Sequence, residues 1–165
     1  MMWPSIALLA FVTLQRLVEL PIAAANTKRL LAAGGHEVAS AHYPLIVAVH
    51  ASWLATLWWL APSRPIELPF LAIFALVEAA RIWVLRTLGP RWTTRIIVVP
   101  GERLVTRGPY RFVDHPNYLV VIAEIAILPL VFGLWHVALL FSVFNAVALA
   151  VRIRAENQAL ETLRP

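Results

Sequence analysis

The sequence contains no cysteine and few charged residues. Only 14% of its 165 residues are Asp, Glu, Lys or Arg. The lack of cysteine excludes disulfides, thiolate metal sites and a catalytic thiol. The scarcity of charge, beside a hydrophobic content of 61%, excludes an ordinary soluble domain, because a fold of this size could not cover so much apolar surface. We therefore predict an integral membrane protein.

Long apolar runs divide the chain into five expected membrane helices. Each run approaches the roughly 20 residues that a helix needs to cross the hydrocarbon core. The last two runs are joined by Gly133-Leu134, which predicts a tight helical hairpin. The predicted fold is all-α, a polytopic single integral-membrane domain over residues 1–165, with spans at 3–25, 43–61, 68–88, 117–132 and 134–151.

Basic residues are distributed unevenly between the two faces that five spans would create. Almost all Lys and Arg residues of the connecting segments fall on one face, whereas Arg64 falls on the other. Positively charged loops stay in the cytosol, so we predict an external N-terminus and a cytosolic C-terminus. The polar elements 89–118 and 152–165 then share the cytosolic face. The formal charge of +5 reflects this topology and anionic lipid, so nucleic acid is not a predicted partner.

Charged residues also interrupt the apolar runs. Arg16 and Glu19 lie three residues apart in the first span. Glu78 and Arg81 repeat this spacing in the third span. Side chains three apart share a helix face, so the two helices can satisfy one another's charges in the bundle interior, and a structural network is expected. The alternative is a small transporter or channel subunit, in which these residues and Glu124 line a proton or solute path.

Two loops carry further local signals. Gly34-Gly35 predicts a turn in the polar connection 26–42, whose His and Glu residues lack the HExxH spacing of a zinc site, so no metal is predicted. In the polar interval 89–115, the segments RIIVV and ERLVTRG flank Pro100-Gly101. This pattern predicts a short β-hairpin or an extended flap on the membrane surface. No GxGxxG follows a strand, which excludes a Rossmann-type cofactor site.

Two polar motifs flank the C-terminal hairpin. They are RGPYRFVDHPNY at 107–118 and RIRAEN at 152–157. Because the hairpin crosses the membrane and returns, both motifs should meet on one face. Helical spacing places one stripe of residues along the last span and into the interface: Asn145, Leu149, Arg152 and Glu156.

The His115-Pro116 pair opens the fourth span. The first-turn amides of that helix lack helical partners and favour an anion. We expect the side chains of His115, Tyr118, Arg152 and Glu156 to converge there on one zwitterionic ligand. Glu156 would bind its ammonium group and the arginine its carboxylate.

These motifs resemble those of the isoprenylcysteine carboxyl methyltransferases and their small bacterial relatives, integral membrane enzymes that use S-adenosylmethionine. The resemblance covers roughly residues 78–160, with GPYRFVDHPNY and RIRAENQAL in the family's order. With the motif geometry, it predicts catalytic Arg152 and Glu156, and the cofactor-binding residues Tyr110, Arg111, His115, Pro116, Asn117, Tyr118 and Glu156. The acceptor's tail is expected to enter from the bilayer near Asn145, Leu149 and Glu124.

The chain departs from the family pattern at three places. Asp114 stands where a basic residue usually precedes His-Pro, and Asn157 replaces the second acid of a Glu-Glu pair. The sequence also stops at Pro165, without the tyrosine-containing tail that often closes over the cofactor. The pair formed by Arg152 and Glu156 is retained.

The resemblance implies methyl transfer to an oxygen of a lipophilic acceptor, at the cytosolic face of a bacterial cytoplasmic membrane. The first half is similar to a bacterial subgroup, some of whose members methylate alkylpyrone or alkylresorcinol hydroxyls, whereas the family name implies a prenylcysteine carboxylate. A related membrane reductase or a phospholipid N-methyltransferase is an alternative. The sequence predicts neither a single acceptor nor an oligomeric state.

Overall fold

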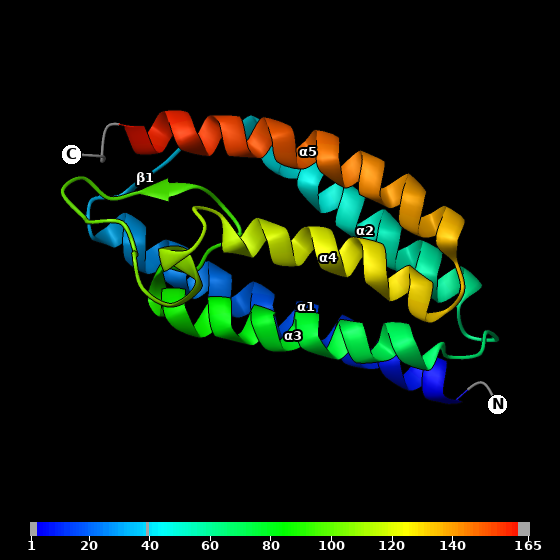
Figure 1. Cartoon of the computed structure of the whole chain (residues 1–165). Coiled ribbons are helices and arrows are strands. Elements are labelled where there is room, and N and C mark those ends of the chain that lie inside the picture. The colour runs from blue at the N-terminus through cyan, green and yellow to red at the C-terminus, as the bar shows by residue number, and fades with distance from the viewer. Residues whose placement is uncertain (1–2, 39, 162–165) are drawn as a thin grey trace.

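Five helices, each antiparallel to the one before it, form a bundle in the computed structural model, which describes residues 3–38 and 40–161 (Figure 1). The helices are α1 (Trp3–Ala32), α2 (Tyr43–Leu60), α3 (Leu68–Leu88), α4 (Pro116–Val131) and α5 (Trp135–Glu161). The connections hold the strands β1 (His36–Glu37) and β2 (Ile97–Val98) and the 3-10 turns η1 (Ser40–His42), η2 (Gly89–Arg91) and η3 (Gly108–Arg111). The all-α prediction is confirmed.

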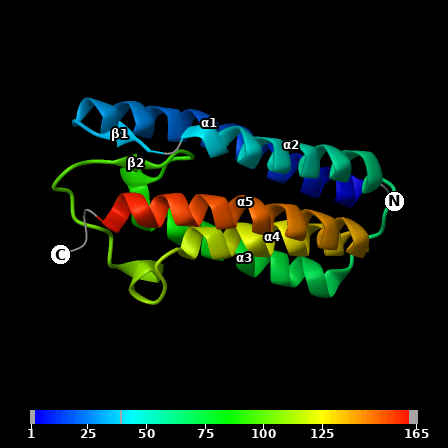
Figure 2. The ribbon, with the colours of Figure 1, turned by 90° about the horizontal axis from the view of Figure 1, so that it is seen from above.

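The helices lie in two layers, α1 with α2 and α3 with α4 and α5 (Figure 2). A tight turn joins α4 to α5, and Gly133 within it has a φ of 68°, a left-handed conformation that glycine adopts without strain. The predicted C-terminal hairpin is therefore confirmed. Large apolar side chains fill the core, among them Trp53, Leu57, Ile125 and Phe132, each at most 2% exposed.

The outer surface is apolar. Large side chains such as Leu76 and Leu139 are 72% and 62% exposed, which suits contact with lipid rather than water. α1, α2, α3 and α5 are long and apolar enough to cross a membrane. α4 is apolar but has 16 residues, about 24 Å of helix against a hydrocarbon core of about 30 Å. The chain is an integral membrane protein in which α4 is shorter than a full crossing.

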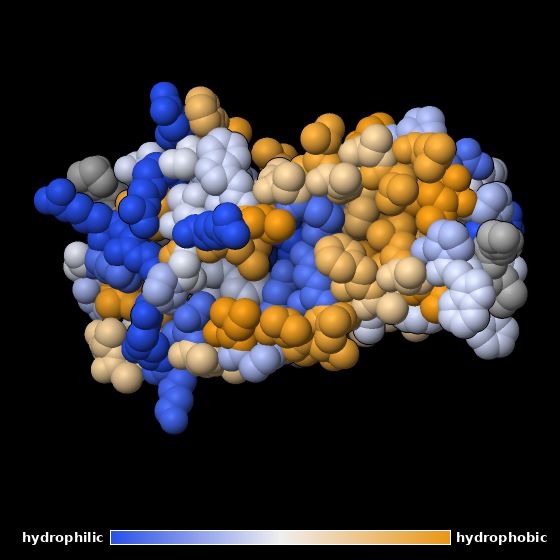
Figure 3. Space-filling view, turned by 90° about the horizontal axis from the view of Figure 1, so that it is seen from below, coloured by the Kyte–Doolittle hydropathy of each residue, from blue (hydrophilic) through white to orange (hydrophobic). Residues whose placement is uncertain are grey.

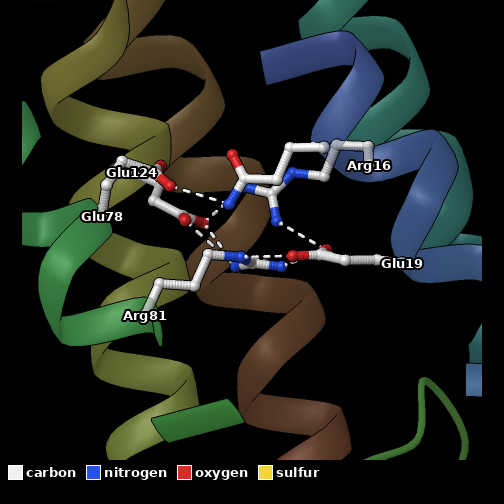
Figure 4. A network of polar contacts seen from close by, with 6 residues as sticks. Arg16, Glu19, Glu78, Arg81 and Glu124 are labelled. Carbon is white, nitrogen blue, oxygen red and sulfur yellow. Dashed lines mark hydrogen bonds and ion pairs between the residues drawn. The ribbon is translucent and has the colours of Figure 1, made fainter. Parts of the chain in front are cut away.

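Charged side chains meet in the interior between the two layers (Figure 4). Arg81 of α3 donates from Nε to Glu19 of α1 at 2.8 Å and from Nη1 to Glu124 of α4 at 3.0 Å. Arg16 of α1 donates to the same two carboxylates, at 3.2 Å to Glu19 and 2.7 Å to Glu124. The expected structural network is confirmed, and it joins three helices, because Glu124 of α4 takes part as well.

α1 continues beyond the predicted end of the first span. The expected span ended at residue 25, yet the helix runs to Ala32, because no Gly or Pro stands between residue 25 and Gly34. The chain turns at the predicted place, where Gly34 has a φ of 88° and the N–H of Gly35 donates to the Leu30 carbonyl at 3.0 Å. The polar connection is therefore shorter than predicted.

Of the two structures predicted around Pro100-Gly101, the β-hairpin is wrong, whereas the extended flap stays a prediction. The turn itself forms, with Gly101 at a φ of 76°, but residues 102–106 form no strand. β2 instead pairs antiparallel with β1. The turn at Gly34 brings β1 alongside β2. The Arg95 guanidinium supports this pairing by donating to the Glu37 carboxylate at 2.8 Å. The connection after α1 thus supplies the partner strand.

Candidate active site

A cavity of about 270 Å³ is lined by residues of the loops between α3 and α4, the start of α4 and the end of α5. These segments lie at one end of the bundle (Figure 1). The antiparallel hairpin returns α5 beside the start of α4, so the two polar motifs meet as predicted. Their side chains at the cavity are Tyr110, Asp114, His115, Asn117, Tyr118, Arg152 and Glu156. The opposite wall comes from the loop 91–106 and from the apolar ends of α1 and α3 at Leu30 and Leu88.

The hydroxyl group of Tyr118 lies between the two predicted catalytic residues. The Arg152 Nε–H donates to this hydroxyl at 2.9 Å, and the hydroxyl donates in turn to the Glu156 carboxylate. The Arg152 guanidinium also lies 5.6 Å from the centre of the Tyr118 ring. One turn of α5 separates the arginine from the glutamate, and the tyrosine of α4 bridges that turn. The arginine and the carboxylate are therefore held at fixed positions on the cavity wall.

His115 is held beside this group. Its ring stacks on Tyr118 with centroids 5.3 Å apart, and its Nε2 lies 2.9 Å from Asn157 Oδ1. An amide oxygen only accepts, so Nε2 carries the hydrogen. Nδ1 faces Glu156 at 4.0 Å. Asn157, which the sequence marked only as a departure from the family pattern, orients the histidine.

The start of α4 leaves donors at the cavity. Pro116 occupies the first turn of the helix, and the His115 side chain makes no capping hydrogen bond. Pro116 has no N–H, and the Tyr118 N–H donates to the His115 carbonyl at 3.1 Å, so the Asn117 N–H is the first-turn amide left for a ligand. The N-terminal end of the helix also carries partial positive charge. Asn117 in this turn lines the cavity. An anionic group of a ligand is thus favoured at this wall.

Tyr110 stays a neutral phenol at this site. Burial raises the pKa of Tyr110 above its usual value, and the negative charge of Glu156 raises it further. Since the pKa moves upward, the hydroxyl keeps its proton throughout the physiological range. Tyr110 can therefore act as a hydrogen-bond donor to a ligand and not as an anionic base.

Replacing Gly108 with alanine is expected to distort the turn that carries Tyr110. Gly108 has a φ of 58°, where a side chain costs about 1–2 kcal/mol, and a Cβ would lie 2.6 Å from Oγ1 of Thr87. Gly101→Ala is the matched control, because Gly101 has a φ of 76° with open space around it. Thermal unfolding in detergent should show the larger loss for Gly108→Ala. Equal losses would contradict the close contact with Thr87.

Other predicted residues lie away from the cavity. Arg111 is exposed, with its guanidinium 4.8 Å from the Phe112 ring centre, and Pro116 is buried in the first turn of α4. Asn145 and Leu149 are buried on the face of α5 that carries Arg152, deeper in the bundle. Glu124 belongs to the ion network. Residues 162–165 of the predicted element 152–165 lie outside the described residues.

The loop 91–106 contributes residues that sequence reasoning missed. Arg91 forms an ion pair with Glu102 at 2.5 Å and donates to the Arg103 carbonyl at 2.7 Å. These contacts link the start of the loop to its later residues. The Asn26 amide of α1 donates to the Trp92 carbonyl at 2.9 Å. These contacts hold the loop as a wall of the cavity. Their only signal in the sequence was a polar, arginine-rich interval.

Comparison with known proteins gives a consistent result. Residues 70–162 match the isoprenylcysteine carboxyl methyltransferase (ICMT) family. A Bacillus subtilis (strain 168) protein, the uncharacterized protein YpbQ, is 38% identical over 93% of this chain and 95% of its own length. An uncharacterized protein of Haemophilus influenzae is 31% identical over 58% of this chain and 56% of its own. No solved structure matches the chain.

Proposed function

The chain belongs to the isoprenylcysteine carboxyl methyltransferase family, and from this premise we propose that it uses S-adenosylmethionine to methylate an oxygen of a lipophilic acceptor. The observation that carries the proposal is the bridge of Arg152, Tyr118 and Glu156 on the wall of a cavity at one end of the bundle. It places a cation, a phenol and a carboxylate next to Asn117 in the first turn of α4, at the positive end of the helix dipole.

The side chains at the cavity suit S-adenosylmethionine. The ligand has an ammonium and a carboxylate group, and the site offers carboxylates at Glu156 and Asp114 and amide donors at Asn117. The volume of about 270 Å³ is slightly below the range of small-molecule sites, which run from about 300 to 1,000 Å³. Apolar walls at Leu30, Leu88 and the loop 91–106 would cover the less polar parts.

S-adenosylmethionine supplies a methyl group on a sulfonium that needs no further activation as a leaving group. The protein's task is then to orient the acceptor oxygen and to exclude water. Arg152 would bind an acceptor carboxylate or stabilise a phenolate, with its direction fixed by the Tyr118 hydroxyl. For a hydroxyl acceptor, Glu156 would receive the proton.

The acceptor would reach this site from the bilayer. Its tail would enter between the helices near Asn145, Leu149 and Glu124; Asn145 and Leu149 lie on the face of α5 that carries Arg152. A prenylcysteine carboxylate and an alkylpyrone hydroxyl both have a reactive head and an apolar tail of this kind. We place the site at the cytosolic face of a bacterial cytoplasmic membrane, because the basic connections gather at this end.

Titration calorimetry of the detergent-purified protein with S-adenosylmethionine and S-adenosylhomocysteine tests the proposal. Both ligands should bind saturably, and Glu156→Ala should weaken binding by about 30-fold or more, the effect of removing one partner of a buried charge pair. Glu67→Ala, an exposed carboxylate at the other end of the bundle, is the matched control. His115→Ala should also weaken binding.

Two outcomes would redirect the proposal. If the folded wild type binds neither ligand, the methyltransferase assignment fails, and nicotinamide cofactors would test a reductase. If loss of function follows the intramembrane charges while Glu156→Ala and His115→Ala remain active, the transport alternative gains support. Product analysis would separate methylation of an oxygen from methylation of a nitrogen.

A further inference from the structure

The ion network holds one carboxylate more than it holds guanidinium groups. Two cations face three acids in the bundle interior (Figure 4): Arg16 and Arg81 against Glu19, Glu78 and Glu124. Glu19 and Glu124 each accept from both arginines. The hydrogen bond of Glu78 comes instead from a neutral group, the side-chain amide of Gln15, whose Nε2 donates to Oε2 at 2.8 Å. The excess negative charge therefore falls on Glu78.

Two oxygen atoms beside that hydrogen bond are left unsatisfied. Glu78 is 8% exposed, and its Oε1 is buried without a hydrogen-bond partner. The same is true of Oε1 of Gln15. These atoms belong to the Gln15 amide and the Glu78 carboxyl group, which the hydrogen bond from Gln15 Nε2 to Glu78 Oε2 already joins. Buried acceptors without a donor are unfavourable, and one hydrogen between them would satisfy both.

We propose that Glu78 is a proton-binding site and forms a cyclic acid–amide pair with Gln15. A proton taken from water forms an O–H bond at Oε1 of Glu78, using a lone pair of the carboxylate. That O–H donates to Oε1 of Gln15, while Nε2 of Gln15 donates to Oε2 of Glu78. The pair then has two hydrogen bonds, and the network of two arginines and two remaining carboxylates is electrically neutral.

His50 of α2 is the other titratable group facing the network, within electrostatic range of Arg16, Arg81 and Glu124. Its Nδ1 lies 2.8 Å from the Ile46 carbonyl, so the ring already donates within its own helix. A second proton on His50 would neutralise the net charge of the network. However, Oε1 of Glu78 and Oε1 of Gln15 would still lack a hydrogen-bond partner. The unsatisfied oxygens therefore favour Glu78 as the proton carrier.

The proton would join the two layers of the bundle. Gln15 lies on α1 and Glu78 on α3, which belong to different layers (Figure 2). Hydrophilic side chains occupy the middle of one face of the molecule, with apolar surface beside them (Figure 3). If the folded protein holds this proton more tightly than the unfolded chain does, the stabilisation is complete below the pH at which an ordinary glutamate titrates, and it is lost progressively as the pH rises.

Infrared spectroscopy of the detergent-purified full chain tests the site directly. The wild type should show the carbonyl band of a protonated carboxyl group at neutral pH, and Glu78→Gln should lack it. Gln15→Leu should keep the band but shift its frequency, because the amide partner is gone. His50→Ala and Glu67→Gln should leave the band unchanged. Identical carboxyl spectra for the wild type and Glu78→Gln would overturn the proposal.

Thermal unfolding gives an independent readout. Glutamine at position 78 can form two hydrogen bonds with Gln15 without a proton, so Glu78→Gln should keep its neutral-pH stability. Between neutral and alkaline pH, the wild type should lose at least about 4 °C more in Tm than Glu78→Gln. Binding of S-adenosylmethionine should be the same in both proteins.

Discussion

Replacing Arg152 with methionine is expected to lower the rate of methyl transfer by about 100- to 1,000-fold. Arg152 is 7% exposed, and its Nε–H donates to the Tyr118 hydroxyl, so the guanidinium is held in one direction at the cavity. Removing a fixed donor from a site of developing charge typically costs about 2.7–4 kcal/mol of transition-state stabilisation. Methionine replaces the apolar stem of the arginine side chain but has no guanidinium group.

Turnover can be followed as S-adenosylhomocysteine release, with N-acetyl-S-farnesylcysteine and an alkylpyrone as acceptor probes. Arg154→Met is the matched control, because Arg154 lies on the same helix and is exposed. Tyr118→Phe should lower kcat less than Arg152→Met, since it removes the fixing hydrogen bond but keeps the cation. Full turnover in Arg152→Met with either probe would contradict the role of this arginine for that acceptor.

Replacing Arg81 with methionine is expected to destabilise the bundle by about 3–5 kcal/mol. Arg81 is 4% exposed and donates to Glu19 and Glu124, which would be left with fewer compensating charges. Removing one partner of a buried pair has a large effect because the remaining charge cannot be solvated in the interior. The variant should therefore unfold at a lower temperature and lose the anchoring of α1 to α3.

The matched control is Arg86→Met, on the same helix but exposed. It should change the melting temperature little. Adding Glu124→Gln to Arg81→Met should recover part of the stability, because one uncompensated carboxylate is removed. Equal melting temperatures for Arg81→Met and Arg86→Met would show that the network does not stabilise the fold.

The meeting of the site residues could be predicted because it depends on short-range spacing. Arg152 and Glu156 share a face of one helix, and the hairpin returns them to His115 and Tyr118. The arginine and the glutamate were expected as a pair on this face, whereas the structure joins them through a tyrosine of another helix. Spacing along one helix does not specify which group of a second helix will lie between two side chains.

The direction of loop side chains could not be predicted from the same information. Arg111 lies in the GPYR motif and was expected to bind the cofactor, which stays a prediction; in the structure its guanidinium lies over the Phe112 ring and outside the cavity. The role of Asn157 was not foreseen either, since its amide acts on His115, which is distant in sequence. Both contacts depend on the irregular segment before α4, which carries Arg111 and places His115 beside Asn157 of α5.

The sequence by itself determined that this is a helical membrane protein and where its helices turn. Apolar runs of span length can satisfy their backbone groups in lipid only as helices, and Gly34 and Gly133 supply the left-handed turns that end them. The tertiary structure alone decided the long-range partners. Arg81 bonds to α1 and α4, and β2 pairs with the segment after α1. Several partners of equal chemistry were available along the chain, and only packing of the two layers brought these groups within bonding distance.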